Sequence, residues 1–236
     1  MTRRTFVLPL LCSLALLAAC DTPGVDPDLT GLVLEADGTP VADAAVGVIY
    51  RLDGLALPGD WPIPASPDKP RTGVTYTLPE AATVTITVLT YDRRPIRTLA
   101  DEALPAGVHM VIWDATDDAG TPQPSGLYIV RIEGEGMPVT ESEVFLYLYE
   151  PAEIARAPHA ISAADGRFRI RHTLLPLGEV LTTTDETGAE VGHAVVSAQF
   201  QVLAVAPDGD GFRTVTRVVD WPDGPAGVDL TLTLPD

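Results

Sequence analysis

The sequence Trp113-Asp-Ala-Thr-Asp-Asp-Ala-Gly-Thr-Pro-Gln-Pro-Ser-Gly-Leu-Tyr128 lies near the middle of the chain, and the other segments can be placed relative to it. It begins at the end of an apolar run. It then passes through aspartates, glycines and prolines, which favour tight turns, and enters a second apolar run. This order predicts two strands joined by a turn-rich connection.

Segments on both sides of this stretch show the two-residue period of β-strands. Between Thr83 and Val88, threonine alternates with valine or isoleucine, which places the threonines on a solvent face and the branched apolar residues on a core face. His109, Val111 and Trp113 share one face of the run 108–113. Further strands are predicted at 127–133 and 143–149.

The whole chain is predicted to be all-β, with two β-sandwiches. After residue 20 no amphipathic helical run stands out, whereas short runs rich in Val, Thr, Ile, Leu and Tyr recur between turn signals. Asp-Gly pairs supply the positive φ angles of tight turns. They occur at Asp37-Gly38, Asp165-Gly166, Asp208-Gly209 and Asp223-Gly224.

Residues 1–19 are predicted to be an export signal. Arg3 and Arg4 precede an apolar run, and small residues lead to Cys20. Leu17-Ala-Ala-Cys20 resembles a bacterial lipobox, which implies that Cys20 becomes a lipidated N-terminus and that residues 20–28 form a tether. The alternative is an ordinary secretory signal. Asp21 resembles an inner-membrane retention signal of some bacteria.

The charge of the chain restricts its partners. It carries 15 Lys+Arg and 33 Asp+Glu, a formal net charge of −18 at pH 7. Such a surface repels phosphate backbones, so no nucleic-acid partner is expected. The two cysteines are Cys12, inside the predicted signal, and Cys20, so no disulfide is expected in the mature chain.

The first strands after the tether resemble a known domain family. Gly31-Leu-Val-Leu-Glu-Ala-Asp-Gly-Thr-Pro-Val-Ala-Asp-Ala-Ala-Val46 reads as a strand, an Asp-Gly turn and a second strand from about Ala45. This pattern resembles the opening of a carboxypeptidase regulatory-like (transthyretin-like or Cna-B-like) β-sandwich. After a proline-rich connector at 58–70 and a further module, the pattern resumes at Ala160–Ile170.

The middle of the chain resembles a second family. Between about residues 70 and 149 stand Tyr-Thr-Leu-Pro-Glu, Leu-Pro-Ala-Gly-Val-His, Trp-Asp, Asp-Asp-Ala-Gly and Ser-Gly-Leu-Tyr, in this order. The succession is similar to the Ig-like domain named after the flagellar hook-capping protein, the FlgD type. The resemblance implies that Trp113 is a core residue and that Gly120, Gly126 and the aspartates shape the turn.

Together, the two resemblances predict a nested arrangement. One discontinuous sandwich would comprise residues 29–60 and 151–236, and the Ig-like sandwich, residues 61–150, would be inserted in one of its loops. Two strands alone cannot bury a core, which favours this arrangement. The alternative is a tandem of independent segments.

Catalytic motifs are not apparent in the sequence, so we expect neither an enzyme nor a cofactor. His109, His159, His172 and His193 lack metal-ligand spacing, and Ser125 lies in a Pro-Ser-Gly turn without a nucleophile motif. The densest carboxylate cluster, Asp114, Asp117 and Asp118, is a candidate weak calcium site, because calcium takes 6 to 8 oxygen ligands. The alternative role of these aspartates is turn capping.

The predicted function is that of a non-catalytic, lipid-anchored structural or protein-interaction module of the cell envelope. The alternative is a carbohydrate- or peptide-binding surface lipoprotein that uses exposed aromatic side chains. Trp61 and Trp221 are the candidate stacking residues for that alternative, with Tyr50 or Tyr91 as further candidates.

Overall fold

The computed structural model describes residues 28–54, 72–184, 190–222 and 227–235. It confirms an all-β fold with one short α-helix in this part of the chain. In chain order the elements are β1 (Leu29–Leu34), β2 (Ala45–Gly54), β3 (Thr72–Leu78), β4 (Ala82–Thr90), β5 (Pro95–Leu104), β6 (Gly107–Trp113), β7 (Gly126–Gly134), β8 (Thr140–Leu146), α1 (Pro151–Arg156), β9 (Ala160–Ile161), β10 (Arg167–Ile170), a 3₁₀ turn (His172–Leu174), β11 (Val180–Thr184), β12 (Glu190–Asp208), β13 (Gly211–Asp220) and β14 (Val228–Thr233).

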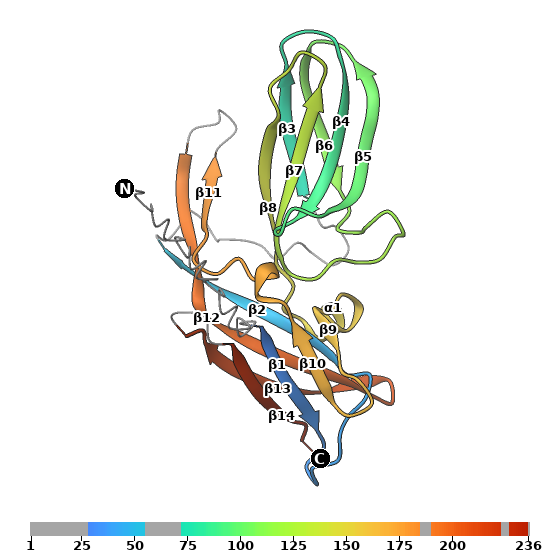
Figure 1. Cartoon of the computed structure of the whole chain (residues 1–236), viewed down its shortest axis with the longest axis vertical. Coiled ribbons are helices and arrows are strands. Elements are labelled where there is room, and N and C mark those ends of the chain that lie inside the picture. Colours follow the sequence, from blue (N-terminus) through green and yellow to red (C-terminus); the bar gives the residue numbers. More distant parts are fainter. Residues whose placement is uncertain (1–27, 55–71, 185–189, 223–226, 236) are drawn as a thin grey trace, which may run out of the picture.

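The strands gather in two groups (Figure 1). The middle group, β3 to β8, contains a sheet of order β5-β4-β7-β8 and the pair β3-β6. The outer group contains the remaining strands, in a sheet of order β10-β1-β14 and a sheet of order β11-β12-β2-β9, in which β13 also pairs with β12. In Figure 1 the blue strands β1 and β2 lie among the orange and red strands of the outer group.

The pairing partners of β1 and β2 come from the far side of the middle group in sequence. β1 runs parallel to β14, with Leu29 opposite Val228, and antiparallel to β10. β2 runs antiparallel to β12, with Val48 opposite Val202, and to β9. The two strands that precede the middle group therefore share sheets with strands that follow it.

The core of the outer group draws on the same distant segments. Leu29, Val46 and Val48 from the first two strands are fully buried together with Val202 and Leu232 from the last ones. Gly31 on β1 lies against the ring of Phe168 on β10. A Cβ atom at Gly31 would come within 2.4 Å of the Leu230 carbonyl oxygen and 2.7 Å of the Phe168 ring. Only a residue without a side chain allows this close packing.

The middle group buries the core that the sequence predicts. Trp113 has no exposed surface and packs against Tyr128 with ring centroids 4.7 Å apart, so its predicted core role is confirmed. In β4, Val84, Ile86 and Val88 are buried while the threonines between them are exposed or half-buried, which confirms the alternation. Tyr128, Val130 and Ile132 are buried on one face of β7.

The turns that the structure describes follow the Asp-Gly pattern. Gly38, Gly166 and Gly209 have φ angles of 86°, 76° and 57°, which favour glycine. The pair Asp223-Gly224 lies outside the described residues.

The short helix α1 was not predicted from the sequence, and it leaves the all-β fold class unchanged. Glu150 and Glu153 form a reciprocal capping box, and Pro151 occupies the first turn. Six residues are too few to show a 3.6-residue hydrophobic period, so periodicity could not reveal this helix. Strand β11 was not predicted either. No helix in the described ranges is long and apolar enough to cross a bilayer.

Candidate functional site

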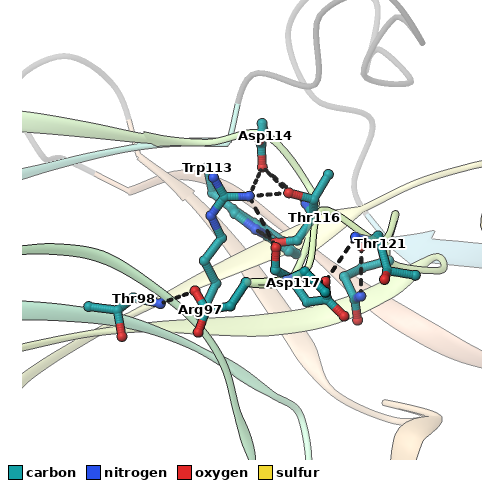
Figure 2. A network of polar contacts seen from close by, with 10 residues as sticks. Arg97, Thr98, Trp113, Asp114, Thr116, Asp117 and Thr121 are labelled. Atoms are coloured by element: carbon teal, nitrogen blue, oxygen red, sulfur yellow. Dashed lines mark hydrogen bonds and ion pairs between the residues drawn. The ribbon is translucent and has the colours of Figure 1, made fainter.

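The loop between β6 and β7 holds the carboxylates that the sequence analysis singled out, and it is closed by its own hydrogen bonds (Figure 2). Asp117 Oδ1 accepts hydrogen bonds from the backbone N–H groups of Ala119, at 2.9 Å, and Thr121, at 2.8 Å. Asp114 Oδ1 accepts from the backbone N–H and hydroxyl of Thr116, at 3.1 and 2.8 Å. These contacts are the turn-capping role of aspartate.

Arg97 on β5 supplies the positive charge of this network. Its Nη1 donates to Asp114 Oδ1 at 2.7 Å, and it also donates to the Thr116 hydroxyl. Burial opposes ionisation of Asp114, but the hydrogen bonds from Thr116 and the charge of Arg97 prevail and lower its pKa. The Trp113 indole N–H donates to the Thr116 carbonyl at 2.7 Å, which joins the loop to the core.

The geometry gives the calcium prediction no support. The Asp118 carboxylate has a partner of its own, because its Oδ1 accepts the backbone N–H of Thr98 on β5 at 3.2 Å. Within the part of the chain that the structure describes, no group of three or more His, Cys, Asp or Glu side chains could hold a metal ion. The guanidinium of Arg97 provides the countercharge for Asp114.

The candidate stacking residues have different surroundings. Trp61 and the predicted lipidation residue Cys20 lie outside the described residues. Trp221 is half-buried and packs against Phe200, with ring centroids 6.1 Å apart. Tyr50 is only 1% exposed, so the suggestion that it offers a stacking surface is wrong. Tyr91 is half-buried, and its hydroxyl bonds to Glu179.

Tyr50 instead lies at the junction between the two groups. Its ring meets Phe145 of β8 edge to face, with centroids 5.5 Å apart, and its carbonyl oxygen accepts a hydrogen bond of 3.0 Å from the Tyr147 hydroxyl. Leu127 of the middle group is buried in the core of the outer group. The two groups thus share an apolar contact surface.

Polar contacts also connect the two groups. Tyr91 donates its hydroxyl hydrogen to Glu179 of the outer group, and Arg171 lies 3.4 Å from Asp92. Burial and the bond to Glu179 raise the pKa of Tyr91 to about 12. Burial and the nearby charge of Glu179 also raise the pKa of Glu143.

His159 of the outer group lies beside the junction, with its ring centroid 6.2 Å from that of Tyr50. Its Nδ1 accepts the Val48 N–H at 3.1 Å, so its proton lies on Nε2, which is shielded from solvent beside the Ser125 backbone. Burial lowers the pKa of His159 to about 4, and the Ser125 backbone partly opposes this shift. The ring is therefore neutral at physiological pH.

Ser125, just before β7, is hydrogen-bonded to Leu148, just after β8. Its hydroxyl donates to the Leu148 carbonyl at 2.9 Å and accepts the Leu148 N–H at 2.7 Å. It is 4% exposed, as expected of a structural turn residue. No local pattern in the sequence predicts the junction, because residues that meet there, such as Tyr50 and Tyr147, are separated by 97 positions.

The start of the described chain is also fixed. The Asp28 carboxylate is buried and pairs with Arg169 and the backbone N–H of His172, the latter at 2.9 Å. Burial opposes ionisation of Asp28, but the bonds from His172 and Arg169 prevail and lower its pKa. Any segment before Asp28 therefore joins the outer group at a defined point.

Comparison with known proteins finds a family match in the middle of the chain. Residues 66–136 match the family model of the FlgD Ig-like domain. The match includes β3 to β7 and the loop with Asp114 and Asp117. The resemblance of this part to that family is confirmed. No curated protein matches the chain.

Proposed function

We propose that this chain is a non-catalytic, lipid-anchored protein of the bacterial cell envelope that serves as a structural or protein-interaction module. The lipobox-like sequence ending at Cys20 motivates the anchor. Because Asp28 is tied to Arg169 and His172, a lipid on Cys20 would hold the body within about 26 Å of a membrane, at roughly 3.3 Å per residue.

We further propose that the chain is built from two sandwiches, the second inserted in a loop of the first. The pairing of β1 and β2 with strands after residue 159 is the single observation that supports this most strongly. The carboxypeptidase regulatory-like resemblance of the outer segments agrees with it. The junction around Tyr50, Phe145 and Tyr147 would then fix the orientation of the inserted sandwich.

This architecture suits a spacer or docking module. Both groups have filled apolar cores, and the carboxylates of the 114–121 loop are occupied by internal bonds. A partner would therefore bind to the outer surfaces of the strands. Carbohydrate or peptide binding through Trp221 is the second proposal, although the contact with Phe200 covers part of that ring.

The anchor can be tested by metabolic labelling with a fatty acid in a bacterial host, followed by fractionation. We expect label on the full chain and recovery with the membranes, and loss of both in Cys20→Ser. The matched control is Cys12→Ser, whose thiol lies inside the predicted signal. Absence of label on the unaltered chain would refute the lipid anchor, and label retained in Cys20→Ser would refute Cys20 as its site.

A further inference from the structure

The outer face of the β3-β6 pair is apolar and uncharged. Val108, Met110 and Ile112 alternate along β6 with exposed fractions of 72%, 66% and 57%. Their cross-strand neighbours on β3 are exposed as well: Thr77, Thr75 and Gly73. Contiguous apolar patches of this kind mark interaction sites on soluble domains.

The edge of β6 is open in the part of the chain that the structure describes. β6 has one hydrogen-bonded neighbour, β3, so every second residue of β6 directs its N–H and C=O away from the sheet. The ladder between the two strands runs from Thr72–Trp113 to Leu78–Gly107 without a bulge. β6 also contains no proline and no charged residue, which are the usual means of blocking an edge.

Several other edges in the structure carry charge, whereas β3, β9 and β11 do not. β10 carries Arg167 and Arg169, β8 carries Glu141 and Glu143, and β14 carries Asp229. The chain as a whole has a net charge of −18, so two copies repel each other over most of their surfaces. An uncharged edge is where two copies can approach without that repulsion.

The order of side chains on β6 suits pairing with itself. In an antiparallel pair of two β6 strands centred on Met110, Met110 faces its counterpart and Val108 faces Ile112 of the other copy. Every antiparallel self-pairing has this two-fold symmetry, and on β6 it opposes apolar side chains at all three of these positions. The same register places Asp114 opposite Ala106, so no acidic residue meets another across the strands.

We propose that a second copy of this chain binds at β6, by antiparallel β6–β6 pairing about a two-fold axis at Met110. The result is a continuous four-stranded sheet, β3-β6-β6-β3, whose face carries six apolar side chains, three from each copy. Strand addition supplies the backbone hydrogen bonds, and the apolar cross-strand pairs set the register. The interface is small, so the dimer exchanges with monomer.

Sedimentation velocity over a concentration series tests the association. The chain starting at Asp21 suffices, because it retains every strand that the structure describes. We expect concentration-dependent dimers that Met110→Lys weakens about tenfold or more, since it places two like charges opposite each other. Val218→Lys is the matched control, because Val218 is 60% exposed on β13, away from β6.

Cysteine crosslinking tests the register. The chain from Asp21 has no cysteine of its own, and opposed residues of antiparallel strands lie within disulfide range. Oxidation should crosslink Met110→Cys to itself. It should crosslink a mixture of Val108→Cys and Ile112→Cys chains more than either alone, because two Val108 positions would lie about 13 Å apart at roughly 3.3 Å per residue.

Three results would overturn the proposal. One is a chain that stays monomeric up to millimolar concentration while circular dichroism shows the folded β spectrum. Another is a crosslinking yield for Val218→Cys equal to that for Met110→Cys. A dimer that survives Met110→Lys would place the contact elsewhere and would likewise refute pairing at β6.

Discussion

Replacement of Ser125 by alanine should destabilise the protein out of proportion to the size of the change. The hydroxyl satisfies both the N–H and the C=O of Leu148, and Ser125 and Leu148 are 4% and 5% exposed. Alanine leaves both backbone groups buried without their partner. Each unsatisfied group costs about 1–3 kcal/mol, and partial relaxation lowers the sum, so we expect a loss of about 2–4 kcal/mol.

Thermal and urea unfolding followed by circular dichroism measure this loss. For a chain of this size, about 1 kcal/mol lowers Tm by roughly 2–4 °C, so the expected decrease is roughly 5–15 °C. Ser142→Ala is the control, because Ser142 is a half-buried serine on β8 and its replacement should cost less than about 0.5 kcal/mol. Equal losses in the two variants would refute the role assigned to the Ser125 hydroxyl.

Three further predictions concern other parts of the structure. Gly31→Ala should prevent folding or lower the free energy of urea unfolding by more than about 3 kcal/mol, because its Cβ would lie 2.4 Å from the Leu230 carbonyl oxygen. Gly38→Ala, which has open space around the Cβ, should lower it by about 1 kcal/mol. The pKa of His159 is lowered from 6.5 to about 4 in the fold, so on acidification the unfolded chain takes up the proton before the folded chain does. The contribution of neutral His159 to the free energy of unfolding is therefore complete above pH 6.5 and decreases as the pH falls toward 4. In His159→Asn, this decrease between about pH 6.5 and 5 should be smaller. Calcium at millimolar concentration should leave Tm unchanged in both the wild type and Asp117→Asn, because the Asp117 carboxylate caps its own loop. A calcium-dependent rise in Tm that is lost in Asp117→Asn would instead support a calcium site.

Much of the fold is predictable because its strands alternate clearly. Thr83 to Val88 shows the solvent and core faces of β4 directly, and the aromatic ring of Trp113 selects the buried face of β6. On β6, however, both faces carry apolar residues. Alternation places Met110 on the face opposite Trp113, but it does not show whether another element covers that face.

The candidate site was less accessible to sequence reasoning because its contacts are non-local. The three aspartates were identified, but Arg97, which pairs with Asp114, stands 17 positions earlier. The junction contacts of Tyr50 and Tyr91 depend on how the two groups of strands meet. No local pattern encodes that meeting, and an aromatic residue such as Tyr50 looks the same in sequence whether it is buried or exposed.

Disulfide trapping between β2 and β12 tests the central claim most directly, namely that strands on either side of the middle group form one sheet. Ile49 lies opposite Gln201, and Gln201 lies opposite Val218 on the next strand. In the chain from Asp21, the pairs Ile49→Cys with Gln201→Cys, and Gln201→Cys with Val218→Cys, should both crosslink within one molecule. Ile49→Cys with Val218→Cys should not, because strands two apart are about 10 Å from each other. Crosslinking of the second pair without the first would show that β2 does not pair with β12, and would contradict the account.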